Sequence, residues 1–94
     1  MATLLSGVSA NGAGSGASHS GPCTVMVHGD TVFDGARVAL EVADTDTAAD
    51  YVAIDGAVLK NHDVLGVNVK GTYYLRAVVT GAGSSTSLNV VTTQ

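Results

Sequence analysis

The 94-residue chain is short of the residue types from which most functional sites are built. It has no tryptophan, one phenylalanine, three tyrosines and a single cysteine, Cys23. One cysteine allows neither an internal disulfide nor a four-cysteine metal site within the chain. The four cations, Arg37, Lys60, Lys70 and Arg76, are scattered along the sequence. Because nucleic-acid binding needs clustered Lys and Arg to displace counterions, we expect no nucleic-acid partner.

Charge of either sign is scarce. Charged residues make up 13% of the chain, and the net charge is −4; an average domain has about 25% charged residues.

No segment approaches the roughly 18 apolar residues of a membrane helix, so we expect no membrane partner. The first six residues have no positive charge and no long apolar run. This predicts that no signal peptide is present and that the protein is made in the cytoplasm.

The sequence does contain segments in which apolar and polar side chains alternate. Between Gly71 and Gly81, the side chains at 73, 75, 77 and 79 are Tyr, Leu, Ala and Val, and the intervening ones are mostly polar. This period of two predicts a strand with one face toward a core. Shorter alternating or apolar segments at 23–28, 36–43, 51–54, 64–70 and 86–93 are separated by turn signals such as Phe33-Asp34-Gly35. We therefore predict an all-β sandwich of six or seven short antiparallel strands.

The N-terminal segment has a different composition from the rest. Residues 3–10 predict a weak strand, and residues 11–21 have the Gly, Ser, Ala and Asn content of a linker. We predict a flexible or extended arm over residues 1–21 and a sandwich domain over 22–94; the alternative is a hairpin with a short second strand at 16–20. An arm would be dispensable for folding and would offer Leu4 and Leu5 as candidate protein contacts.

Three kinds of chemical site can be tested against the sequence. Asp44, Asp46 and Asp50 have part of a calcium-loop spacing, but alanine stands at 49, where such a loop needs glycine. A solvated hairpin loop whose carboxylates bond nearby backbone amides is the favoured alternative. Cys23 and His28 fall on opposite faces of one predicted strand, so they would not bind one metal ion. No Gly-x-Ser-x-Gly motif accompanies the histidines. We predict a non-enzymatic protein with no catalytic residue, cofactor or metal.

Tyr74 and Arg76 share the outer face of the predicted 72–80 strand. Because tyrosine and arginine are enriched at protein–protein hot spots, these two residues are further candidate contacts. An ordinary exposed strand face, with Arg76 stacked on Tyr74, is the alternative.

Two groups of residues carry a family resemblance over 21–93. The Gly-x-Tyr-x-Leu start of the 72–80 strand is similar to the tyrosine corner of immunoglobulin-like sandwiches. In addition, the Phe-x-Gly-Ala-x-Val hairpin at 33–38 and the Gly-x-Tyr-x-Leu-Arg-Ala strand at 71–77 resemble those of small β-sandwich structural proteins of tailed bacteriophages. Relatives often have tryptophan in the strand after the Asp-rich loop, where this chain has Tyr51.

The resemblance implies a virion structural role. Its foremost form is a capsid decoration, or cement, protein on the surface of the phage head, made in the host cytoplasm. The partners would be the major capsid protein or other virion subunits, and the chain would form a homo-oligomer, with a trimer suited to three-fold lattice positions. The alternatives are a module of the tail, a head fibre or the connector, or a receptor- or carbohydrate-binding module of the virion.

Overall fold

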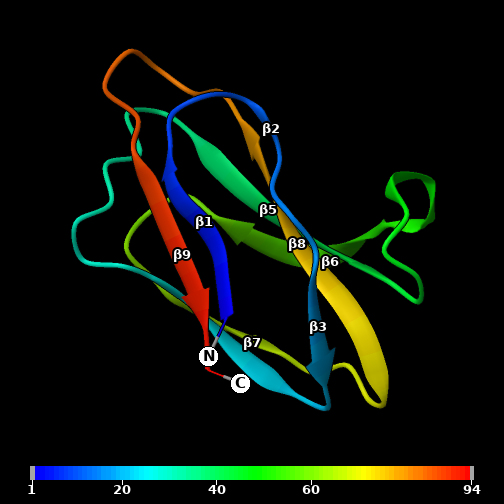
Figure 1. Cartoon of the computed structure of the whole chain (residues 1–94). Helices are drawn as coiled ribbons and strands as arrows, with labels where there is room; N and C mark the ends of the chain where they lie inside the picture. Colours follow the sequence, from blue (N-terminus) through cyan, green and yellow to red (C-terminus); the bar gives the residue numbers. More distant parts are fainter. Residues whose placement is uncertain (1, 94) are drawn as a thin grey trace.

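The computed structural model describes residues 2–93, and its strands form two layers (Figure 1). Besides one 3-10 turn, η1 (Ala48–Asp50), the regular elements are strands: β1 (Ala2–Val8), β2 (Gly12–Ala13), β3 (Ala17–Ser20), β4 (Cys23–Val27), β5 (Arg37–Ala43), β6 (Val52–Leu59), β7 (Val64–Val67), β8 (Thr72–Thr80) and β9 (Leu88–Thr92). Sheet A has the order β1-β9-β4-β7. Sheet B has the order β2-β8-β5-β6, with β3 also paired to β8. The predicted all-β sandwich is confirmed, and its pairings are antiparallel.

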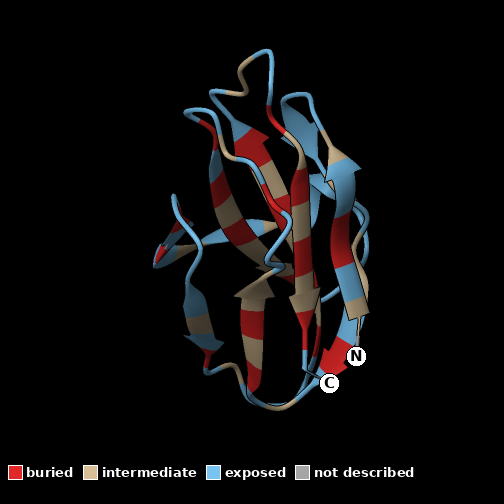
Figure 2. Ribbon diagram, turned by 90° about the vertical axis from the view of Figure 1, so that its left-hand side faces the viewer, coloured by how far each residue is buried: buried red, intermediate tan, exposed pale blue. Residues whose placement is uncertain are grey.

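The core lies between the sheets, and alternating residues of the central strands β4, β5, β8 and β9 supply much of it. Figure 2 shows the buried positions as bands that alternate with less buried ones along the central strands. On β8, Tyr73, Leu75, Ala77 and Val79 are at most 4% exposed, as the period of two predicts. The remaining buried apolar residues come from both sheets: Leu4, Leu5, Cys23, Val25, Ala36, Val38, Leu40, Ala43, Ala57, Leu59, Val67, Leu88 and Val90.

The N-terminal segment belongs to both sheets, which differs from the predicted arm. β1 pairs with β9 in sheet A, whereas β2 and β3 pair with β8 in sheet B. Leu4 is 4% exposed and Leu5 is 2% exposed, so both residues fill the core. The predicted boundary at residue 21 therefore does not separate an arm from a body. The alternative strand at 16–20 exists as β3, but it pairs with β8 and not with the preceding strand.

Close approach explains two of the glycines that gave residues 11–21 the composition of a linker. The N–H of Gly14 donates to the carbonyl of Ala77 on β8 at 2.8 Å. A Cβ on Gly14 would lie 2.8 Å from the carbonyl oxygen of Leu4, which is closer than real Cβ contacts allow. A Cβ on Gly16 would overlap Oη of Tyr51 and Oδ1 of Asp46. Here glycine is needed because the backbone crosses tightly packed groups, and not because it is mobile.

The topology does not reproduce immunoglobulin strand pairing. In an immunoglobulin sandwich the last two strands, F and G, share one sheet. In this chain β9 pairs with β1 and β4 in sheet A, while β8 pairs with β3 and β5 in sheet B. The hydroxyl of Tyr73 donates to the carbonyl of Gly21 at 2.7 Å. Gly21 precedes Tyr73 by 52 residues, so this bond joins distant segments and is not a tyrosine corner, which reaches only a few residues upstream.

Two turn predictions have different outcomes. Asp34 and Gly35 both have positive φ, and the N–H of Ala36 donates to the carbonyl of Phe33 at 2.9 Å. The expected tight turn is therefore present. The predicted strand at 51–54 does not end in a turn: it continues as β6 through a bulge at Asp55 and Gly56, where the pairing with β5 jumps from Val58 to Ala53. Gly56 supplies the positive φ that this irregular backbone requires.

Candidate docking surface

The outer face of sheet A carries two rows of uncharged residues. Its central row crosses all four strands of the sheet, because the register places Thr3 beside Val91, Val91 beside Met26, and Met26 beside Val64. A second row joins Thr93, Thr24 and Gly66. We call these seven residues the sheet A face.

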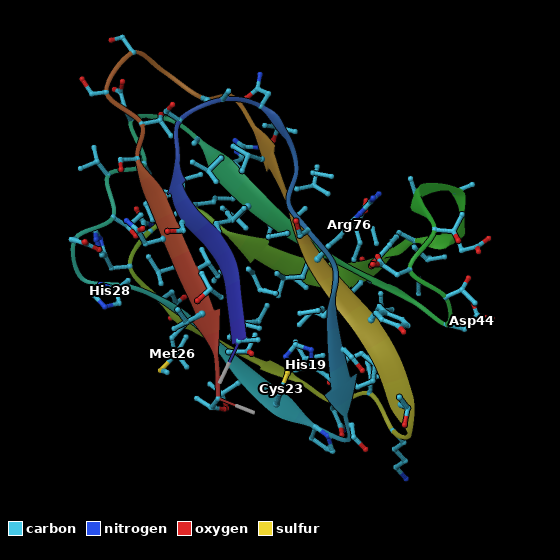
Figure 3. All side chains as sticks on the ribbon, in the orientation of Figure 1. His19, Cys23, Met26, His28, Asp44 and Arg76 are labelled. Atoms are coloured by element: carbon cyan, nitrogen blue, oxygen red, sulfur yellow. The ribbon has the colours of Figure 1, made fainter. Side chains whose placement is uncertain are left out.

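No member of the sheet A face carries a charge. Met26 and Val91 are partly exposed, and Val64 is 60% exposed. Figure 3 shows Met26 projecting from the left side of the view, away from the core. Covering these residues with another surface costs little desolvation free energy, since no ion has to leave water.

Two shallow hollows adjoin this face. One, of about 380 Å³, is lined by Thr24, Gly66 and Thr93 together with Cys23 and neighbouring residues. The other, of about 320 Å³, lies at the opposite end and is lined by Thr3 and Val91, with His28 and Asp30 at its rim. The sheet A face is thus shallowly contoured, which favours contact with another surface over enclosure of a small ligand.

Asn89 fixes one end of the face. Its Oδ1 accepts from the N–H of Gly7 at 2.9 Å, where β1 is irregularly paired with β9. Its carbonyl accepts from the N–H of His28 and from the hydroxyl of Thr31, at 2.8 and 3.0 Å. The side chain and backbone of one residue therefore hold the β1 bulge and the loop after β4 in place.

The outer face of sheet B is charged and covered. Nε and Nη2 of Arg76 on β8 each lie 2.7 Å from Oε1 of Glu41, its cross-strand neighbour on β5. The guanidinium carbon of Arg76 lies 4.1 Å from the ring centroid of Tyr51. The hydroxyl of Tyr51 donates to Oδ1 of Asp46 at 2.7 Å. The loop at 44–51 thereby covers the ion pair, whose side chains are 16% and 20% exposed.

The covering loop changes the acidity of its tyrosine. Burial raises the pKa of Tyr51 to about 12, and the hydrogen bond to the carboxylate of Asp46 acts in the same direction. A second acidic side chain of this loop, Asp50, accepts from the hydroxyl of Thr45 at 2.5 Å. Asp46 and Asp50 therefore bond groups within the loop, although these groups are hydroxyls and not the expected backbone amides.

The four candidate contact residues are not brought together. Leu4 and Leu5 lie in the core, and Arg76 is held between Glu41 and Tyr51. Tyr74 is partly exposed on the sheet B side, between Ser18 and Ala43 in the register. The stacking partner of Arg76 is Tyr51 and not Tyr74, because the 44–51 loop folds back over β8.

Sequence reasoning missed the sheet A face, although a signal for part of it was present. The alternation at 23–28 already places Thr24 and Met26 opposite the inward Val25. What it does not reveal is that β9 and β7 flank β4, which aligns Val91 and Val64 with Met26.

A buried polar cluster joins the two sheets behind this face. His19 is 2% exposed, and its ring stacks on Tyr73 with centroids 5.8 Å apart. The hydroxyl of Tyr73 lies 3.5 Å from Sγ of Cys23. Burial is the main reason that the pKa of Tyr73 lies well above its usual value. Figure 3 shows His19 and Cys23 close together between the layers.

Within residues 2–93, no three His, Cys, Asp or Glu side chains are grouped so that they could hold a metal ion. Over the same residues, no helix has the length and apolar character needed to cross a membrane. The sequence matches no known family model and no curated protein, and the fold matches no solved structure.

Proposed function

We propose that this chain is a non-enzymatic virion structural protein that decorates and stabilises a phage capsid. The observation that supports the proposal is the sheet A face, an uncharged surface that spans every strand of one sheet. The resemblance of the 33–38 hairpin and the 71–77 strand to phage sandwich proteins points to the same role. The partner would be the major capsid protein or a neighbouring virion subunit.

The physical logic is multivalency. A face of Thr, Val, Met and Gly residues forms no strong individual contact, but a capsid lattice repeats the same contact many times. Small affinities that are repeated on one particle multiply, so a weak face is sufficient for stable decoration. A homo-oligomer of the chain would strengthen this effect, because each bound copy would hold its neighbours near the lattice. A surface that becomes covered on the particle also needs fewer charges for solubility.

The decisive experiment is co-sedimentation with expanded capsids assembled from the proposed partner, a major capsid protein. The wild-type protein should pellet with the capsids and raise their melting temperature. Met26→Asp places a charge at the centre of the sheet A face and should weaken binding at least tenfold. Val52→Asp is the matched control, because Val52 is 66% exposed on β6 of sheet B.

The result that would contradict the proposal is wild-type protein that stays in the supernatant at every salt concentration. Equal binding by both variants would place the contact elsewhere on the molecule. Circular dichroism of each variant confirms that the sandwich is intact, and Thr24→Asp provides a second charge on the same face if Met26→Asp unfolds.

A carbohydrate-binding role has less support. Such modules stack sugars on exposed aromatic rings, which make good platforms for apolar sugar faces. Among residues 2–93, the Tyr73 ring is buried against His19 and the Tyr51 ring covers Arg76, which leaves Tyr74 as the remaining partly exposed tyrosine.

A further inference from the structure

The sandwich has two open sides, and they are built differently. At one side β1 and β3 lie near each other, because residues 2–20 pass from sheet A to sheet B. The edge strand β1 is protected by two register shifts against β9. At the other side the edges are β6 and β7. Irregular or charged edges resist pairing with other chains, whereas flat and uncharged ones invite it.

Of the two strands at this second side, β6 is protected and β7 is not. β6 has the bulge around Gly56 and the exposed charge of Asp55. β7 pairs with β4 in four consecutive positions without a register shift. Residues 64–69 contain no charge and no proline. Three of the four exposed large apolar residues of the described chain, Val52, Val58 and Val64, lie on these two strands.

The hydrogen bonding shows which backbone groups of β7 face outward. The N–H of Val27 on β4 donates to the carbonyl of Asp63 at 3.2 Å. Because hydrogen-bonding direction alternates along an antiparallel strand, residues 65 and 67 also face β4, and Val64 and Gly66 point their backbone groups away from it. The outward N–H of Val64 donates to Oδ1 of Asp63, the preceding residue of the same chain, at 2.7 Å. A Cβ on Gly66 would meet no atom within 4 Å.

We propose that β7 pairs with β7 of a second copy of this chain, antiparallel and centred on Gly66, to join two sheets A into one continuous sheet. The charges favour this partner and this direction. Asp63 precedes the uncharged segment and Lys70 follows it. An antiparallel pair brings the acidic end of each strand near the basic end of the other, whereas a parallel pair would bring like charges together. This inference does not depend on the proposed capsid role.

The pairing exchanges existing bonds for new ones. The N–H of Val64 leaves the carboxylate of Asp63 and donates to the carbonyl opposite it, that of Asn68 in the second copy. Asp63 is then free to approach Lys70 of the second copy. At the two-fold axis Gly66 lies opposite itself, and the absence of side chains lets the backbones approach. Such a contact is isologous and closes at two copies, not three.

The contact is small. A pair of four- to six-residue strands buries far less than the roughly 1,600 Å² of a stable complex. We therefore expect a dissociation constant on the order of 0.1 to 1 mM for the free protein. Sedimentation equilibrium of the full chain from about 20 µM to 2 mM, which brackets this constant, should show an average mass that rises from that of one copy toward that of two.

A charge-swap experiment tests the position of the axis. Gly66→Lys places two like charges opposite each other and should weaken the dimer at least tenfold, and Gly66→Glu should do the same. An equimolar mixture of the two variants should recover the dimer, because opposite charges then meet. Gly29→Lys is the matched control: its φ is not positive, a Cβ there would meet no atom within 4 Å, and it lies in the turn after β4.

Three results would overturn the inference: a wild-type protein that stays monomeric throughout this range, a dimer that Gly66→Lys leaves intact, or folded Lys and Glu variants whose mixture stays monomeric. If the variants do not fold, amide hydrogen exchange of the wild-type protein decides. The outward N–H groups of Val64 and Gly66 should become protected as concentration rises, and unchanged exchange there contradicts the pairing. Capsid binding without any dimer would remove this inference and leave the proposed function in place.

Discussion

Nε2 of His19 on β3 lies 2.8 Å from Oγ1 of Thr92 on β9, and this bond joins the two sheets inside the core. Nδ1 of His19 lies 2.9 Å from the carbonyl of Ala17. Because a carbonyl can only accept, Nδ1 of His19 donates to Ala17, and Nε2 is joined to the hydroxyl of Thr92. His19 is 2% exposed and Thr92 is fully buried, so neither group can turn to water if the other is removed.

Thr92→Val should therefore destabilise the protein by about 1 to 3 kcal/mol, since it keeps the shape of the side chain but leaves Nε2 of His19 buried without a partner. Urea unfolding followed by circular dichroism measures the change. Thr3→Val is the matched control on the exposed outer face and should stay within about 0.5 kcal/mol of the wild type. Equal stability of the two variants would show that the hydrogen bond between His19 and Thr92 contributes nothing to the free energy of unfolding.

Deletion of residues 1–20 should abolish folding, in contrast to the behaviour of an arm. The deletion removes β1, β2 and β3 and takes Leu4, Leu5 and His19 out of the core. The single substitution Leu5→Ala should cost about 2 to 5 kcal/mol through lost burial and the cavity left behind. Far-ultraviolet circular dichroism and thermal melts report both effects. A truncated protein with a cooperative melt near that of the full chain would restore the arm interpretation.

Gly16→Ala should displace the 44–51 loop from sheet B, because the added Cβ overlaps Tyr51 and Asp46. The backbone of Gly16 does not have the positive φ that would strain an alanine, so the effect comes from contact alone. We expect a loss of about 1 kcal/mol, from the Tyr51–Asp46 bond and the Arg76 stacking. Near-ultraviolet circular dichroism of the tyrosines should change with it. Gly29→Ala, where a Cβ meets no atom within 4 Å, should alter neither signal.

Tyr51 should make the protein less stable as pH rises from 10 toward 12. Its pKa is about 12 when folded and 10.0 in the absence of burial, so in this window the unfolded chain loses the proton while the folded one keeps it. The contribution of Tyr51 to the free energy of unfolding is complete below pH 10 and declines above it. Tyr51→Phe should reduce this decline in urea unfolding, and the raised pKa of Tyr73 accounts for the part that remains. A difference titration at the tyrosinate absorbance, wild type minus Tyr51→Phe, that shows a midpoint near 10 would contradict the buried hydrogen bond to Asp46.

Local patterns decided which segments extend and which faces turn inward. The alternation from Tyr73 to Val79 required one apolar side, since successive side chains of a strand point to opposite faces whatever their neighbours are. The Asp34-Gly35 turn was equally local, because positive φ is accessible to these residues without tertiary support. The strands from β4 to β9 correspond to six predicted segments, but the described residues contain nine strands, more than the six or seven predicted, because residues 2–20 also form strands.

Pairing between distant segments was decided only in the folded molecule. Ser18 lies beside Tyr74, and Val91 beside Met26, across long stretches of sequence that carry no local signal of the register. Glycines 14 and 16 could equally mark a flexible linker or a tight crossing, and only the positions of Leu4 and Tyr51 show which applies. The sequence by itself determined an all-β chain with alternating faces and little charge. Tertiary structure alone decided that the N-terminal residues complete the core and that Met26 and Val91 share an uncharged face, because register and sheet order depend on contacts between residues far apart in the chain.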